Sequence, residues 1–226
     1  RLSGVDFKHY KDTTVRRRIA RRMVVNRVQR LGEYVKVLQE NRAELDALYQ
    51  DILIKVTRFF RDPEVFDFLK TNIFPALFQN RAADTPVRIW VPGCSTGEEV
   101  YSIAICLLEF LGEQSTNPPV QIFATDISET AIQSARDGKY LENIGVDVSP
   151  ERLRRFFVHI EGGYQISKPI RDLCIFARQN MTSDPPFSKL DLISCRNVLI
   201  YLDSRLQKRV IPLFHYSLRP NGFLFL

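Results

Sequence analysis

The feature that most constrains the fold is a regular alternation of short apolar runs and helical segments from residue 87 onward. Five runs have the length and the branched or aromatic content of buried strands: Val87–Val91, Val120–Ala124, Cys174–Ala177, Leu190–Cys195 and Phe223–Leu226. Helical patterns separate them, at Glu98–Leu111, Glu129–Asp137 and Ser204–Leu218. Parallel strands joined by crossover helices have this order. We therefore expect an α/β fold, a doubly wound and mostly parallel sheet with helices on both faces.

The first 79 residues have a different pattern, because no strand interrupts their helices. Helical segments are expected near 32–39, 42–56 and 63–78, and the loop 80–86 is a candidate boundary. We expect a helical N-terminal domain at 1–79 and an α/β domain at 87–226. A hairpin pattern around Gly162 and Gly163 interrupts the α/β alternation and predicts a small insertion.

Positive charge is concentrated in the first 30 residues, which hold ten Lys or Arg against two Asp. The whole chain carries a net charge of +6, so this segment accounts for the basic character of the chain. A helix is expected there, with Val15, Ile19 and Met23 on its apolar face. Four arginines occupy the other side: Arg17, Arg18, Arg21 and Arg22. They form either a solvated face or a docking surface for an acidic partner, such as nucleic acid, a membrane or an acidic protein.

The composition disfavours two classes of protein. No apolar run approaches the roughly 18 to 20 residues of a membrane span. The four cysteines form no C-x-x-C pair and the three histidines are far apart in sequence, so we expect no metal site. Free cysteines in apolar surroundings favour a reducing, cytoplasmic setting.

A glycine-bearing turn follows the first strand, and Gly93-Cys94-Ser95-Thr96-Gly97 matches the G-x-S-x-G pattern of a hydrolase nucleophile. That interpretation requires a histidine at the carboxyl edge of the sheet, and neither His159 nor His215 is expected there. The G-x-G-x-x-G spacing of a dinucleotide site is also missing from the sequence. We therefore do not expect Ser95 to be a nucleophile.

Acidic residues around this turn favour another kind of ligand. Glu98 and Glu99 open the following helix, where they suit the helix dipole but would repel a phosphate. Asp126 follows the second strand, where an acid can accept hydrogen bonds from ribose hydroxyls. S-adenosylmethionine has a ribose, a positive charge and no phosphate, and so it fits this set of residues.

Four short motifs span nearly the whole chain: Thr57-Arg58-Phe59-Phe60-Arg61, Gly93-Cys94-Ser95-Thr96-Gly97-Glu98-Glu99, Phe123-Ala124-Thr125-Asp126-Ile127 and Cys195-Arg196-Asn197-Val198-Leu199-Ile200-Tyr201. In this order they make the sequence resemble the CheR family, the chemoreceptor glutamate methyltransferases of bacterial chemotaxis. Two further runs, Val91-Pro92-Gly93-Cys94 and Asp184-Pro185-Pro186-Phe187, are most similar to members fused to a CheB-type methylesterase.

The resemblance implies a helical N-terminal domain, a Rossmann-like domain that binds S-adenosylmethionine, and a small β-subdomain at about 140–176. The residues expected to line the cofactor site are Thr57, Arg61, Gly93, Glu98, Glu99, Asp126, Asn180, Met181, Arg196 and Asn197. Arg61 and Tyr201 are expected at the methyl-transfer centre. The implied partner of the basic helix is the acidic methylation region of a chemoreceptor or a similar acidic helical protein, and neither nucleic acid binding nor membrane insertion is expected.

The chemistry of this reaction agrees with the residues. A glutamate carboxylate has an ordinary pKa of about 4.3, so it is ionised at pH 7 and needs no general base. An arginine can hold such a carboxylate through paired hydrogen bonds, and we assign this role to Arg61. The alternative for Arg61 is an ion pair with Asp62 or Glu64, and the alternative for Tyr201 is a place in the core.

Two departures from the family pattern bear on activity. Lys55 stands where many members have Asn, and the chain ends at Leu226, where the family's sheet continues with two more strands. We therefore expect a C-terminal truncation. The alternative function is a catalytically weak, S-adenosylmethionine-binding sensor or docking module in a multidomain signalling protein.

Overall fold

The computed structural model describes most of the chain, with short gaps. The described residues are 7–53, 56–79, 81–82, 84–112 and 118–226. Lys55 lies outside them. No helix among these residues is both long and apolar enough to cross a membrane. Contacts divide the chain into two compact units, residues 1–55 with 198–209, and residues 56–197 with 210–226.

The boundary between the units differs from the expected one. The sequence predicted a boundary at 80–86, whereas the units divide at 55/56. The helices between 63 and 78 therefore belong with the sheet. Phe66, Leu69 and Phe74 explain this, because they are buried in the same apolar cluster as Ile89 of the first strand.

The first unit is built on three helices, α1 (Asp12–Val25), α2 (Leu31–Glu40) and α3 (Arg42–Ile52). Two 3-10 turns also belong to it, η1 (Phe7–His9) and η4 (Leu199–Tyr201). Tyr34, Leu48 and Ile52 form its buried core, and the expected apolar face of α1 packs against them. Helical stability in such a unit comes mainly from this burial.

Arg22 does not belong to the exposed face of α1 on which the sequence placed it. Its guanidinium pairs with the carboxylate of Glu44, with an Nε–Oε1 distance of 2.9 Å and a second contact from Nη2 to Oε2. Tyr34 donates its hydroxyl to the same carboxylate at 2.6 Å. The hydrogen bond from Arg22, aided by that from Tyr34, lowers the pKa of Glu44 to about 2 although burial opposes it. Arg22 is thus a structural residue.

The second unit is built on a five-stranded sheet with strand order β6-β2-β1-β7-β8. Its strands are β1 (Val87–Pro92), β2 (Val120–Asp126), β6 (Cys174–Arg178), β7 (Leu190–Ser194) and β8 (Leu218–Phe225). Every neighbouring pair is parallel, which confirms the expected doubly wound sheet. The last strand begins earlier than the predicted Phe223, because the expected turn around Asn221 is an irregularity between the pairs Leu190–Leu218 and Leu192–Phe223.

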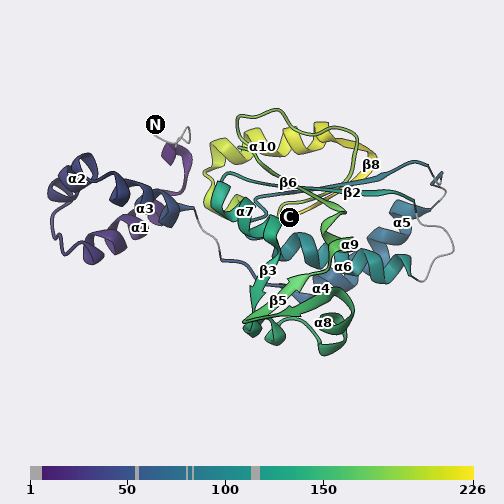
Figure 1. The fold of residues 1–226 in the computed structure, drawn as a ribbon. Helices are drawn as coiled ribbons and strands as arrows, with labels where there is room; N and C mark the ends of the chain where they lie inside the picture. The colour runs from purple at the N-terminus through teal and green to yellow at the C-terminus, as the bar shows by residue number, and fades with distance from the viewer. Residues whose placement is uncertain (1–6, 54–55, 80, 83, 113–117) are drawn as a thin grey trace. The chain divides into compact units, whose positions relative to one another are not determined.

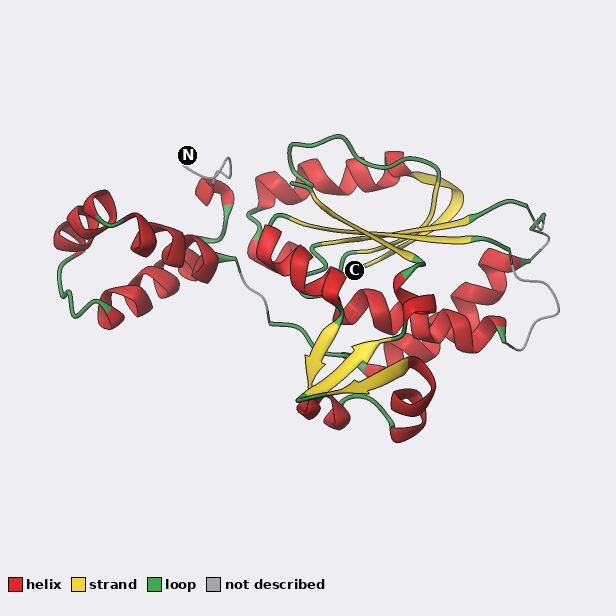
Figure 2. Cartoon of the chain, viewed as in Figure 1, coloured by secondary structure: helices red, strands yellow, loops and turns green. Residues whose placement is uncertain are grey.

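Helices cover both faces of this sheet (Figures 1 and 2). On one face α6 (Glu98–Leu111) joins Ile89 and Val91 of β1 in a single buried cluster. On the other face, residues of α10 (Ser204–Ser217) pack against Trp90, whose ring meets that of Phe214 edge-on at 5.6 Å. The helix α7 (Glu129–Asp137) follows β2, and Ser128 caps it by accepting a hydrogen bond from the Ala131 N–H.

The segment 63–78 is broken, although the sequence predicted one helix. It consists of α4 (Pro63–Phe68), a π-helical segment η2 (Leu69–Ile73) and α5 (Phe74–Phe78). Pro75 has no N–H with which to continue the α-helical pattern, and the Phe74 N–H bonds to the carbonyl of Leu69, five residues back. The proline therefore accounts for the change of helix type.

A second, three-stranded antiparallel sheet with strand order β3-β5-β4 is inserted between α7 and β6. It comprises β3 (Lys139–Leu141), β4 (Phe157–Ile160) and β5 (Gly163–Ile166), with η3 (Glu142–Val146), α8 (Pro150–Phe156) and α9 (Lys168–Arg171) beside them. The expected hairpin is present, and Gly162 supplies its left-handed turn residue with φ of 78°. This insertion is called the small sheet below.

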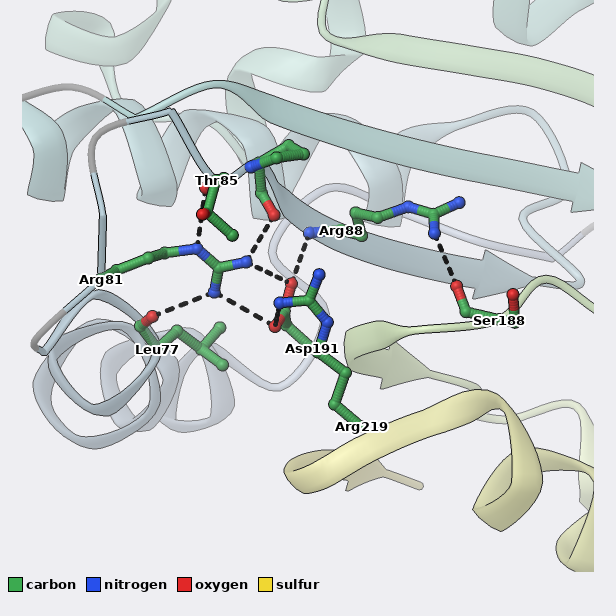
Figure 3. Close-up of polar contacts among 8 residues, drawn as sticks. Leu77, Arg81, Thr85, Arg88, Ser188, Asp191 and Arg219 are labelled. Carbon is green, nitrogen blue, oxygen red and sulfur yellow. Dashed lines mark hydrogen bonds and ion pairs between the residues drawn. The ribbon is translucent and has the colours of Figure 1, made fainter.

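A buried ionic cluster fixes the chain where it enters the main sheet (Figure 3). Arg81 donates to both carboxylate oxygens of Asp191 in β7, at 3.1 and 2.9 Å. Asp191 also accepts from the backbone N–H of Arg88 at 2.8 Å. These residues lie at the amino ends of β1 and β7, and ligands bind such sheets at the carboxyl ends. The cluster is therefore part of the scaffold.

Glu44→Gln should destabilise the helical unit, because it leaves the half-buried Arg22 guanidinium without a counter-charge. We expect a loss of about 3 kcal/mol at pH 7. The pKa of Glu44 falls from an ordinary 4.5 to about 2 on folding, so the stabilisation is full above pH 4.5 and is lost as the pH falls through that interval. Urea unfolding followed by circular dichroism at pH 7 and at pH 2.5 measures both effects.

Asp46→Asn is the matched control, since Asp46 pairs with Arg42 on the same helix in an exposed ion pair, with side chains 64% exposed. Exposed pairs contribute little to stability, so we expect almost no change. Equal losses in the two variants, or a Glu44→Gln effect that does not shrink in acid, would contradict the structural role of Arg22.

Candidate functional site

The carboxyl ends of β1 and β7 lie side by side at the centre of the sheet, although the strands are far apart in sequence. From β1 the chain builds the sheet outward through β2 and β6, and it then places β7 and β8 on the other side. Such a reversal leaves a crevice outside the carboxyl ends of the strands, where open α/β sheets bind ligands. Most of the predicted cofactor residues lie at or just after the carboxyl ends of β1, β2, β6 and β7.

The loops at this edge hold several residues in the left-handed region of φ. Ser95, at 51°, lies in the loop after β1, and Asn197, at 56°, lies in the loop after β7. Phe60 and Asp62, at 46° and 58°, lie in the segment before α4. Left-handed backbone is strained for residues other than glycine, and such strain clusters at functional sites. The strain thus marks three of the segments that carry predicted site residues.

Asp126 braces three loops at this edge of the sheet. Its carboxylate accepts hydrogen bonds from the backbone N–H of Ser95 at 2.9 Å and of Ser128 at 2.8 Å. Its backbone carbonyl accepts from the Gln179 N–H at 3.0 Å, which adds the loop after β6. Each carboxylate oxygen can accept more than one hydrogen bond, so this bracing is compatible with the predicted contact to a ribose.

Glu98 and Glu99 begin α6 but differ in their partners. Glu99 accepts a hydrogen bond from the Ser194 hydroxyl at 2.6 Å, which joins α6 to the end of β7. Burial raises its pKa, while Ser194, Arg196 and Arg61 oppose that rise. Glu98 accepts from the Thr96 hydroxyl at 2.9 and 2.7 Å, and burial raises its pKa too. Two half-buried carboxylates at this helix end would, when ionised, repel a phosphate and attract a cation.

Arg196, a predicted cofactor residue, is first of all a tie between segments. Its Nη2 donates to the carbonyl of Arg61 at 2.9 Å and to Oδ2 of Asp62 at 2.6 Å. Its side chain is 6% exposed, and the guanidinium lies over the rings of Phe66 and Phe225. Arg196 therefore holds the Thr57–Arg61 motif against the end of β7.

Arg61 itself lacks the internal ion pair that the sequence left open. Asp62 pairs with Arg196 instead, and among the described residues no hydrogen bond or ion pair of the Arg61 guanidinium is found. The residue is half-buried, close enough to Glu99 to act on its pKa. Phe59 and Phe60 beside it are 1% and 5% exposed, and the Phe60 N–H bonds to the Ser102 hydroxyl of α6 at 2.9 Å. These contacts anchor the loop, while the Arg61 guanidinium remains available to bind a ligand.

A pocket of about 350 Å³ opens beside this motif. Two predicted cofactor residues, Thr57 and Glu98, line it. Tyr140, Asn143 and Asp147 of the small-sheet region line it as well, although no sequence pattern indicated these three. Part of the pocket wall therefore comes from the inserted sheet.

Asn180 and Met181 lie in the loop after β6. The Asn180 side-chain carbonyl accepts hydrogen bonds from the backbone N–H of Thr182 at 3.0 Å and from its hydroxyl at 2.7 Å. Phe187 anchors the same loop by stacking on Phe123 of β2, with ring centroids 4.6 Å apart. The Asn180 oxygen thus closes its own turn, and no hydrogen bond of its amide NH₂ is found among the described residues. Met181 is half-buried.

Ser95 is not arranged as a nucleophile. Its Oγ is buried and has no hydrogen-bond partner among the described residues, so no base activates it. Gly93, before it, is also left-handed, with φ of 71°. His159 lies in the small sheet, where its ring packs against Tyr164. The geometry thus agrees with the rejection of a hydrolase.

The remaining predicted residues belong to the helical unit. On α1, Arg17 and Arg21 are exposed and Arg18 is half-buried, whereas Arg22 is held by Glu44. Tyr201 ends η4, and its carbonyl accepts a hydrogen bond from the Lys11 N–H at 2.9 Å. The exposed part of the predicted docking face is therefore smaller than the sequence indicated.

Gly97→Ala should destabilise the second unit, because Gly97 has φ of 96° and no room for a side chain. A Cβ there would lie 3.1 Å from that of Ala135 and 3.2 Å from atoms of Tyr101 and Tyr140. Strain and overpacking together are expected to cost about 2 kcal/mol or more. Thermal unfolding measured by calorimetry tests this expectation.

Gly162→Ala is the control that separates strain from crowding. Gly162 has φ of 78°, but nothing lies within 4 Å of the position of its Cβ. We expect a smaller loss of stability than for Gly97→Ala. Losses of equal size would show that the contacts around Gly97 do not constrain the loop.

Comparison with known proteins agrees with this geometry. The family model described as "CheR methyltransferase, SAM binding domain" matches residues 55–226, and "CheR methyltransferase, all-alpha domain" matches residues 1–53. An uncharacterized 104.1 kDa protein of Rhodobacter capsulatus is 42% identical over the whole chain, which spans 24% of that protein.

Relatives named for their function are also similar over nearly the full chain. A "Chemotaxis protein methyltransferase" of Borreliella burgdorferi is 31% identical over 98% of the chain and 81% of that protein. "Chemotaxis protein methyltransferase 1" of Pseudomonas aeruginosa is 32% identical over 99% of the chain and 83% of that protein. The chain therefore belongs to the CheR methyltransferase family, and residues 55–226 match its S-adenosylmethionine-binding domain.

Proposed function

We propose that this chain transfers the methyl group of S-adenosylmethionine to glutamate side chains of a chemoreceptor, forming methyl esters in chemotaxis-type signalling. The observation that carries the proposal is the half-buried acidic pair Glu98 and Glu99 at the start of α6. Arg61, which has no ion-pair partner among the described residues, lies close enough to Glu99 to act on its pKa. The names of the relatives from Borreliella burgdorferi and Pseudomonas aeruginosa support it.

The residues of the crevice fit this cofactor. The buried Ser95 Oγ has no partner among the described residues, and a ligand hydroxyl or amine would satisfy it. Burial raises the pKa values of Glu98 and Glu99, so a nearby positive charge would stabilise their ionised forms. We assign to the cofactor site Thr57, Arg61, Gly93, Glu98, Glu99, Asp126, Asn180, Met181, Arg196 and Asn197, with Arg196 and Glu99 acting mainly through the loops they join.

The chain's own part in the reaction is to hold and align the acceptor. Bound S-adenosylmethionine supplies a methyl group made electrophilic by its positively charged sulfur. Arg61 would hold the glutamate carboxylate through paired N–H groups, and Tyr201 stays a proposed catalytic residue. The carboxylate is ionised at pH 7, so alignment and exclusion of water are the catalytic requirements.

The proposed partner is the acidic methylation region of a receptor, or a similar acidic helical protein, docking on α1. Arg17 and Arg21 are exposed one helical turn apart on this helix, and Arg18 is half-buried beside them. Complementary charge of this kind raises the rate of encounter and selects the partner. Arg22 is left out of the proposed surface because Glu44 holds it.

A second candidate function is a sensor or docking module that binds S-adenosylmethionine with little transfer activity. The Rhodobacter capsulatus relative supports this candidate, because the chain spans only 24% of that protein and a matching segment can thus be one part of a much longer protein. Binding of the cofactor without methyl transfer would support this candidate.

The test of methyl transfer uses tritiated S-adenosylmethionine and receptor signalling fragments with Glu or Gln at the methylation positions. We expect label on the Glu fragment, released by alkali as methanol because the product is an ester. Arg61→Gln should lower kcat/KM by about 100-fold or more, because the acceptor loses its paired hydrogen bonds. Its affinity for S-adenosylhomocysteine should fall less than its activity.

Arg154→Gln is the matched control, since Arg154 is exposed on α8 of the same unit. It should transfer methyl groups as the wild type does. Label on the Gln fragment, alkali-stable label, or full activity in Arg61→Gln would each contradict the proposed reaction or the role of Arg61.

A further inference from the structure

Tyr140 links the small sheet to the glycine-bearing loop after β1. It lies in β3, and its hydroxyl donates a hydrogen bond to the backbone carbonyl of Thr96 at 2.8 Å. The Thr96 hydroxyl in turn holds the carboxylate of Glu98. A chain of hydrogen bonds thus runs from the small sheet to an acidic residue assigned to the cofactor.

The ring of Tyr140 contacts a second segment of the site. It meets the ring of Phe59 edge-on, with centroids 4.8 Å apart. Phe59 is 1% exposed and belongs to the Thr57–Arg61 motif. Tyr140 also lines the pocket together with Thr57 and Glu98. One side chain therefore touches both segments that flank the pocket.

The position of Tyr140 is set by the strand next to it. Tyr140 pairs with Tyr164 of β5, and Gly163 lies so close that a Cβ there would be 2.0 Å from the Tyr140 carbonyl oxygen. Since Gly163 must remain a glycine for this approach, β3 sits close against β5. The small sheet thus determines where the Tyr140 hydroxyl reaches.

The hydroxyl remains a hydrogen-bond donor at physiological pH. Burial, with a contribution from the nearby charge of Glu98, raises the pKa of Tyr140 well above its ordinary value. A neutral phenol can donate to the Thr96 carbonyl, whereas a phenolate cannot.

We propose that Tyr140 is a positioning residue for the cofactor site: it holds the Thr96–Glu98 turn and the Phe59 loop in the arrangement that binds S-adenosylmethionine. The inference rests on the proposed function, because it concerns the same site. It gives the inserted sheet a role in cofactor affinity, since that sheet fixes the Tyr140 side chain. Tyr140 does not itself take part in methyl transfer.

The test compares Tyr140→Phe with Tyr164→Phe by calorimetric titration with S-adenosylhomocysteine. Tyr140→Phe keeps the ring but removes the hydrogen bond, and a single hydrogen bond corresponds to about a three- to tenfold rise in Kd. Tyr164 is the Cα partner of Tyr140, and among the described residues its hydroxyl has no hydrogen bond, so Tyr164→Phe should bind like the wild type. In steady-state assays Tyr140→Phe should raise KM for the cofactor and leave kcat nearly unchanged.

Three results would overturn the inference. An unchanged Kd in Tyr140→Phe would show that the hydroxyl does not position the turn. A lower unfolding temperature with an unchanged Kd would leave Tyr140 a purely structural role. An equal rise in Kd for both variants would show that the whole small sheet affects binding and that the Tyr140 hydroxyl has no specific role. A wild-type chain that binds no cofactor would instead reject the proposed function, and this inference with it.

Discussion

The buried guanidinium of Arg196 is the contact on which the arrangement of the site depends. It comes from the end of β7, donates to the Arg61 carbonyl and pairs with Asp62, so it joins segments 135 residues apart in the chain. The charge of the same guanidinium acts on the pKa of Glu99 at the start of α6, and Glu99 accepts a hydrogen bond from Ser194 at the end of β7. A buried charge is stable only when it is paired, so these partners constrain one another and the loops that carry them.

Hydrogen bonds between the chain's own residues hold the loops around the crevice in place. Asp126 braces the loops after β1 and β2, Arg196 and Tyr140 secure the Thr57–Arg61 motif and the glycine-bearing turn, and Asn180 closes its own loop. Preorganised polar groups need little rearrangement when they bind a charged ligand. The Arg61 guanidinium and the Ser95 Oγ differ from these groups, because neither has a hydrogen-bond partner among the described residues.

Much of this fold could be predicted from the sequence, because local signals agree with tertiary packing. The bounds of α6 and α7 match their predictions, and Gly97 and Ser128 mark where these helices begin. The roles of Arg22 and Arg196 could not be predicted, since Glu44 and Asp62 reach them only through the fold. The helices at 63–78 were placed in the wrong unit because an amphipathic pattern shows that a face is buried but does not identify the core that buries it.

The most direct test of this account is a crystal structure of the chain with S-adenosylhomocysteine. We predict one ligand per chain in the crevice beyond β1 and β7, with its ribose hydroxyls on Asp126 and its amino acid end near Glu98. A ligand bound elsewhere, or one whose ribose makes no contact with Asp126, would contradict the account.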